Sequence, residues 1–196
     1  MLVLFSNLIH QFDILSFNQI KDGLIKSAHQ EKKKDSVGVN HSNKGGWQSK
    51  KLSSDNIIVS TVQNEVMGYF IANKTFKENT KVTFGNTWVN INKKGAYNAS
   101  HVHPGSHLSG VMWIKTPQGC GNFIFENPHA FNVECLMDSY SDEYIKQYKN
   151  VTDYYLIPKE GNIIIFPSYL QHRVEENKYN TDRISASFNL RIEPPL

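Results

Sequence analysis

Residues 161–192 read GNIIIFPSYLQHRVEENKYNTDRISASFNLRI, and this stretch indicates the fold class more clearly than any other. Short runs of β-branched and aromatic residues are separated by Gly, Pro and Asn, as is typical of antiparallel strands. In the last run, 183–192, apolar residues take every second position and a polar row lies between them. Successive side chains of a strand point to opposite faces. The polar face therefore points either to solvent or into a barrel.

Runs of the same kind extend back to residue 81 and predict a mainly β fold. Before residue 81 the pattern favours helices over 17–34 and 55–78, a loop over 35–54 and a short strand over 3–12. The polar segment 128–153 is a long insertion or a short helix. At their observed spacing, the strands suit a sandwich or barrel. We expect them at 82–92, 108–115, 122–126, 154–157, 162–167, 171–176 and 183–192.

The chain has 196 residues, which suits a single domain over 1–196 with a helical and loop part at 1–80 and a β core at 81–196. Its two cysteines form no metal-type or redox-type pair, so we expect a cytoplasmic protein without disulfides. No signal peptide and no membrane span is predicted. The net charge of +3 comes from small groups of lysines, which favours a solvated surface over a nucleic-acid partner. The sequence is compatible with a homodimer.

Three of the histidines are placed to bind one metal ion. His101 and His103 precede the strand expected from residue 108, and side chains at i and i+2 of an extended segment point the same way. His172 follows the apolar run 163–166 and could supply a third ligand from a neighbouring strand. Three protein ligands with open positions suit non-haem Fe(II) that activates dioxygen. Zinc, or plain loop histidines, remain alternatives for this pattern.

The polar row of the last strand begins with Arg183 and Ser185. A guanidinium fork and a hydroxyl together match a carboxylate. If this face lines a barrel, the pair would anchor a dicarboxylate whose other end reaches the metal. Upstream, Asn90 and Asn92 share a strand face with Trp88. Their amides could hydrogen-bond the same co-substrate, or they could be ordinary strand surface.

Five pieces of the sequence, taken in this order, carry a family resemblance. They are SNKGGWQS at 42–49, the segment from Trp88 through YNASHVHPGSHLSGVMWI, GNFIFENP at 121–128, GNIIIFPSYLQHRV at 161–174 and RISASFN at 183–189. In them the chain resembles the 2-oxoglutarate and Fe(II)-dependent oxygenases of bacteria and phages. These belong to the wider superfamily of prolyl hydroxylases and nucleic-acid demethylases.

The resemblance implies a double-stranded β-helix, or jelly roll, with N-terminal helices on one sheet and iron between the sheets. It implies His101, His103 and His172 as metal ligands. Most of the superfamily has Asp or Glu two residues after the first His, whereas this branch and this chain have His103. Arg183 matches the residue that pairs with the distal carboxylate of 2-oxoglutarate, and Ser185 completes the motif. The implied reaction is a hydroxylation with dioxygen that releases succinate and CO2.

Two other functions fit part of this pattern. A three-histidine dioxygenase of the cupin kind would use the triad without 2-oxoglutarate and would have no role for Arg183. A jelly-roll binding or assembly protein could carry a vestigial site. The primary substrate stays open among a protein residue, a metabolite and a nucleobase. Residues that face it are expected in loops, with candidates at 45–47, 128–153 and Tyr97.

Overall fold

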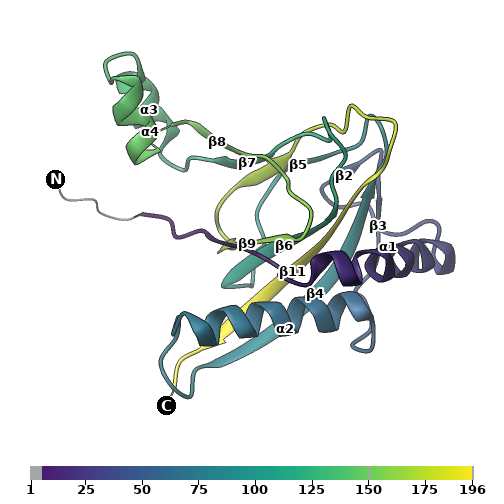
Figure 1. Cartoon of the computed structure of the whole chain (residues 1–196). Coiled ribbons are helices and arrows are strands. Elements are labelled where there is room, and N and C mark those ends of the chain that lie inside the picture. Colours follow the sequence, from purple (N-terminus) through teal and green to yellow (C-terminus); the bar gives the residue numbers. More distant parts are fainter. Residues whose placement is uncertain (1–5, 150, 196) are drawn as a thin grey trace.

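The computed structural model describes residues 6–149 and 151–195, in which two antiparallel sheets pack face to face (Figure 1). The larger sheet has the order β1 (His10–Asp13), β9 (Asn162–Pro167), β6 (Leu108–Lys115), β11 (Arg183–Glu193), β4 (Lys81–Asn92) and β3 (Trp47–Gln48). The smaller sheet has the order β2 (Asn43–Lys44), β5 (Tyr97–His101), β10 (His172–Val174), β7 (Phe123–Glu126) and β8 (Asp153–Leu156). This arrangement is the double-stranded β-helix that the sequence predicted.

Alternation along β9 and β11 builds a core on each face of the larger sheet. Ile163 and Ile165 of β9 belong to the cluster beneath the helices, whereas Ile164 and Phe166 belong to the cluster between the sheets. A strand that is covered on both faces has to be apolar at nearly every position, as this one is. In β11 the apolar set faces the helices, so its polar row lies between the sheets. The row is therefore interior from Arg183 to Ser187, whereas Arg191 at its far end is exposed.

Two helices cover the outer face of the larger sheet (Figure 1). Helix α1 (Phe17–Lys34) has the predicted bounds, and α2 (Ile57–Ala72) begins at Asn56, whose side chain accepts a hydrogen bond from the backbone N–H of Ile58. The expected continuation of α2 to residue 78 was wrong. The chain leaves the helix at Lys74, whose φ of 47° is left-handed and cannot continue a helix.

The other differences from the predicted elements are local. The strand β5 was not among those expected, because Asn98, Ser100 and His101 are polar on both of its faces. Segment 128–153 contains two short helices, α3 (Ala130–Met137) and α4 (Asp142–Tyr148), which project beside β7 and β8 (Figure 1). The first strand starts at His10, and residues 3–5 of the strand expected over 3–12 lie outside the described part. Within the described ranges, no helix combines the length and hydrophobicity that crossing a membrane needs.

Candidate metal centre

Two neighbouring strands of the smaller sheet bring the three histidines together. His172 on β10 is the direct cross-strand partner of His101 on β5. His103 lies two residues beyond the end of β5, where its backbone N–H donates to the carbonyl of Ser168 over 2.9 Å. One ligand nitrogen from each imidazole lies within 4.8 Å of the other two. Strand pairing, rather than the HxH spacing alone, thus creates the cluster.

Backbone carbonyls orient two of the imidazoles. Nδ1 of His101 lies 2.7 Å from the carbonyl oxygen of Ala99, and Nδ1 of His172 lies 2.9 Å from that of Leu170. A carbonyl oxygen can only accept, so each Nδ1 carries the hydrogen and each Nε2 is left with a lone pair. Hydrogen bonds of this kind fix the tautomer and the ring orientation of histidines that bind metals.

The surroundings of the cluster keep its imidazoles neutral. Burial lowers the pKa of His172 to about 3 and that of His103 to about 4, and it also lowers the pKa of His101. The ring of Phe123 stacks on His172 with 5.3 Å between centroids, and Phe166 meets the same imidazole edge-on at 4.7 Å. Neutral imidazole is the form that binds a metal ion, so no proton has to be removed at pH 7.

These donors fit a divalent transition metal. Nε2 of His103 lies 3.2 Å from Nε2 of His172. Two nitrogens at right angles around an ion, each about 2.1 Å from it, would lie about 3.0 Å apart. Three imidazoles from one side leave the remaining positions of an octahedron to small ligands, as non-haem Fe(II) chemistry requires.

A cavity between the sheets joins the histidines to Arg183. Arg183 is 2% exposed and lines this cavity together with His101, His103 and His172. Its Nη1 donates to the carbonyl oxygens of Cys120 and Glu175. Its Nη2 is buried and has no hydrogen-bond partner among the described residues. Burial lowers the pKa of Arg183 to about 10, so the side chain is charged at neutral pH and one of its donors awaits an acceptor.

The other predicted co-substrate residues divide into two groups. Ser185 and Asn90 are cross-strand partners and both line the cavity. The amide nitrogen of Asn90 donates to Ser187 over 3.2 Å, while its oxygen is buried without a partner among the described residues. Asn92 does not line the cavity, because its amide nitrogen donates to Asn98 over 3.1 Å. Asn92 therefore holds Asn98 at the cavity wall.

Sequence reasoning missed Trp113, which also faces this cavity. It lies on β6 opposite Ser185 and is 1% exposed. Its indole Nε1–H is buried without a hydrogen-bond partner among the described residues. Since a buried indole N–H normally has a partner, this donor is a second open position for an acceptor in the cavity. The only hint in the sequence was a Trp within the apolar run 111–114, and a Trp in such a run is equally typical of a hydrophobic core.

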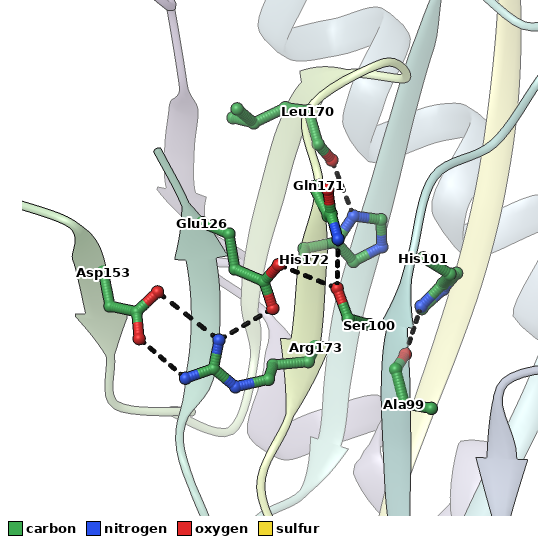
Figure 2. Close-up of polar contacts among 9 residues, drawn as sticks. All are labelled: Ala99, Ser100, His101, Glu126, Asp153, Leu170, Gln171, His172 and Arg173. Atoms are coloured by element: carbon green, nitrogen blue, oxygen red, sulfur yellow. Dashed lines mark hydrogen bonds and ion pairs between the residues drawn. The ribbon is translucent and has the colours of Figure 1, made fainter. Parts of the chain in front are cut away.

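The outer face of the smaller sheet carries a polar network behind the histidines (Figure 2). Arg173 of β10 lies 2.7 Å from a carboxylate oxygen of Glu126 on β7 and 2.7 Å from one of Asp153 on β8. The hydroxyl of Ser100 on β5 donates to Glu126 and accepts from Gln171, each over 2.8 Å. The network thus ties together the strands on which His101 and His172 lie.

The loop at 45–47, a candidate for contact with the substrate, places its aromatic residue in the core. Trp47 is 6% exposed, belongs to the core beneath the helices and donates its indole N–H to the carbonyl of Asp35 over 2.8 Å. Segment 128–153 is not among the residues that line the histidine cavity or the open cleft outside it, whose wall is formed by residues 39–51.

Comparisons with known proteins agree with this geometry. A family model described as "Putative 2OG-Fe(II) oxygenase" matches residues 86–189, which is more than half of the chain. No curated protein matches the sequence.

Solved structures show the same fold at low sequence identity. A viral collagen prolyl hydroxylase from Paramecium Bursaria Chlorella virus-1, in complex with 2OG, is 16% identical with a TM-score of 0.59 over 93% of this chain and 94% of that one. A prolyl hydroxylase from Trichoplax adhaerens, bound to a hypoxia inducible factor peptide, is 9% identical with a TM-score of 0.64 over 95% and 84%. HygX from Streptomyces hygroscopicus, with nickel and 2-oxoglutarate bound, is 10% identical with a TM-score of 0.57 over 97% and 84%.

Proposed function

The chain belongs to the 2OG-Fe(II) oxygenase family, and from this premise we propose that it hydroxylates its substrate with 2-oxoglutarate and dioxygen at a three-histidine iron centre. His101, His103 and His172 would hold the iron. Arg183 would hold the distal carboxylate of 2-oxoglutarate.

The cavity lined both by the histidine cluster and by Arg183, whose buried Nη2 has no partner among the described residues, carries this proposal. A buried guanidinium with an open donor is costly unless an acceptor arrives, and a carboxylate is the acceptor that it pairs with best. A dicarboxylate with its keto acid end on the metal would satisfy both. A dioxygenase that uses the triad alone gives no reason for Arg183 to lie in the same cavity. Solved structures of similar fold contain 2-oxoglutarate and a metal, as expected for this assignment.

When bound, Fe(II) and 2-oxoglutarate supply the oxidation, in which one oxygen atom of O2 enters succinate, released with CO2, and the other enters the substrate as a hydroxyl. The residues of the chain bind, orient and exclude water. Ser185 and the indole N–H of Trp113 would add hydrogen bonds to the carboxylate beside Arg183. Rotation of the Asn90 side-chain amide would let Ser187 donate to its oxygen and free its nitrogen for the co-substrate.

Aromatic rings around the histidines give the site an apolar wall that excludes water. Phe123 and Phe166 lie against His172, and Trp88 lies 5.6 Å from His103 between ring centroids. Excluding water strengthens the electrostatic interactions inside the site and limits side reactions of an oxidising centre. Trp88 also lines the cleft outside, so it stands where a substrate would meet the metal.

Succinate formation tests the proposal. The full chain with Fe(II), 2-oxoglutarate and O2 should form succinate even without its substrate, in a slow uncoupled reaction, while His172→Ala and Arg183→Ala should not. Lys26→Ala, on the outer helix α1, serves as a matched control and should behave like the parent chain. Equal rates in all four proteins would show that the succinate does not come from this site. Oxygen uptake without succinate would favour the three-histidine dioxygenase that needs no 2-oxoglutarate.

A further inference from the structure

An open cleft of about 720 Å³ lies directly outside the histidine cavity. The cleft and the cavity share Trp88, His101 and His103, so a molecule in the cleft has access to the metal ligands. The cleft is lined by eight residues between Val39 and Lys51 and by residues 99–104. Its size falls within the range of roughly 300–1,000 Å³ that is usual for small-molecule sites.

The charged side chains that line this cleft within the described part of the chain are all positive. Lys44, Lys50 and Lys51 line it, and none of the described residues that line it is Asp or Glu. Lys50 is compensated by Asp35, 2.9 Å away. The ion pairs of the described residues include neither Lys44 nor Lys51. The Lys44 ammonium donates only long hydrogen bonds, to the side-chain oxygen of Asn40 over 3.5 Å and to the carbonyl oxygen of His41 over 3.4 Å. Two positive charges are left for a ligand.

The backbone that carries these lysines is firmly held. The side-chain amide of Asn43 donates to the carbonyl of Val39 over 3.2 Å, and buried Trp47 anchors the segment to Asp35. At Gly46 an added Cβ would lie 3.2 Å from the carbonyl oxygen of Ile91, so this stretch packs closely against β4. The basic wall is therefore preorganised, although its ammonium groups are solvated. A preformed site loses less entropy when it binds a ligand.

We propose that the primary substrate is a metabolite-sized anion whose phosphate or carboxylate binds Lys44 and Lys51 while its body lies against Trp88. This inference rests on the proposed function, since it assumes that the molecule in the cleft is the one oxidised. Lysine ammonium groups attract either anion as point charges, whereas the partly exposed indole of Trp88 offers a flat apolar surface. Figure 1 shows β2 beside β5, where Lys44 pairs with Tyr97, four residues along the strand from His101.

Two matched probe pairs test the charge requirement. Adenosine 5′-monophosphate is compared with adenosine, and N-acetylphenylalanine with its uncharged amide. Binding of each is measured by calorimetry on the full chain at low ionic strength, anaerobically, with and without Fe(II) and 2-oxoglutarate. Within each pair the anion should bind about tenfold more tightly, the product of about threefold for each exposed lysine. The pair with the larger ratio identifies the preferred anionic group.

Charge variants locate the effect. Lys44→Gln/Lys51→Gln should abolish the preference for the anion, whereas Lys26→Gln/Lys33→Gln, which removes the same charge from α1, should leave it unchanged. Raising the salt concentration should weaken anion binding in the parent chain. Equal binding of anion and neutral analogue, or a preference that survives in Lys44→Gln/Lys51→Gln, overturns the proposal. Tight binding of a twelve-nucleotide DNA strand or of hexaglutamate in place of the small anions also overturns it.

The measurement without Fe(II) and 2-oxoglutarate separates this inference from the function on which it rests. Failure of the proposed function appears as missing succinate while anion binding at the lysines persists. Failure of the inference appears as missing anion preference while succinate is still formed.

Discussion

Replacing Arg183 by Met should remove 2-oxoglutarate binding while leaving the fold and the metal site intact. Methionine retains much of the length of the buried side chain but has no donor. The guanidinium Nη2 is buried without a partner among the described residues, so its interaction with a carboxylate would be made away from water. Removing one partner of such a buried pair costs about 2–5 kcal/mol. We expect the dissociation constant for 2-oxoglutarate to rise by about 30-fold to several thousandfold.

Stability should change much less than affinity. The substitution leaves the carbonyl oxygens of Cys120 and Glu175 without the Nη1 donor, but it also removes a buried charge that lacks a carboxylate partner. The two effects oppose each other, and we expect a net change within about 2 kcal/mol. Urea unfolding of the metal-free variant measures this change, and anaerobic calorimetry with 2-oxoglutarate on the Fe(II)-loaded chain measures the affinity.

Arg173→Met is the matched control, because it makes the same chemical change on the outer face of the smaller sheet. The Arg173 side chain is 31% exposed and forms two ion pairs there. Pairs of this kind contribute about 0.2–1 kcal/mol each, so we expect a loss of about 1 kcal/mol in stability and less than a twofold change in 2-oxoglutarate affinity. Unchanged affinity in Arg183→Met, or an equal loss in Arg173→Met, would refute the assignment of Arg183.

Three further predictions concern buried groups, and a fourth concerns an exposed glycine. Trp113→Phe should weaken 2-oxoglutarate binding about tenfold in the same calorimetric assay, because it removes a donor to a charged acceptor. Unchanged affinity would show that Trp113 only packs in the core and does not bind the co-substrate. Burial lowers the pKa of His172 to about 3, so the folded chain keeps this imidazole neutral while the unfolded chain protonates it. From this imidazole alone the metal-free chain should therefore lose about 1.5 kcal/mol of stability between about pH 6.5 and pH 5. His103, whose pKa burial lowers to about 4, should add a similar loss, and a constant urea midpoint over that range would contradict this. Gly110→Ala should cost about 3 kcal/mol in a thermal melt, because its Cβ would overlap the ring of Phe188. Gly68 lies on α2, and a Cβ added there would meet nothing within 4 Å. Gly68→Ala should therefore stabilise the folded chain by about 1 kcal/mol.

Periodic elements could be predicted from the sequence, while contacts between distant segments could not. A continuous apolar run located β9 and apolar alternation located β11, because burial of both faces or of one face dictates the residue types. Strand β5 was missed because its residues serve the site and a polar network instead of a core. The end of α2 was missed because no Pro or Gly marks Lys74, whose left-handed backbone stops the helix.

The candidate site shows the same division. Its histidines and Arg183 could be named from motif order, but only strand pairing shows that His101 and His172 are cross-strand partners. The pattern grouped Asn92 with Asn90, although the two amides have different partners, because a shared strand face does not decide which side chain reaches a cavity. Trp113 escaped notice since an indole suits both a core and a binding site.

An anaerobic structure of the full chain with Fe(II) and 2-oxoglutarate is the decisive test of the proposed site. We expect one ion roughly 2.0–2.3 Å from Nε2 of His101, His103 and His172, near the range for imidazole ligands. We also expect the distal carboxylate of 2-oxoglutarate to accept a hydrogen bond from Nη2 of Arg183. An ion bound elsewhere, or 2-oxoglutarate bound away from Arg183, would contradict this assignment.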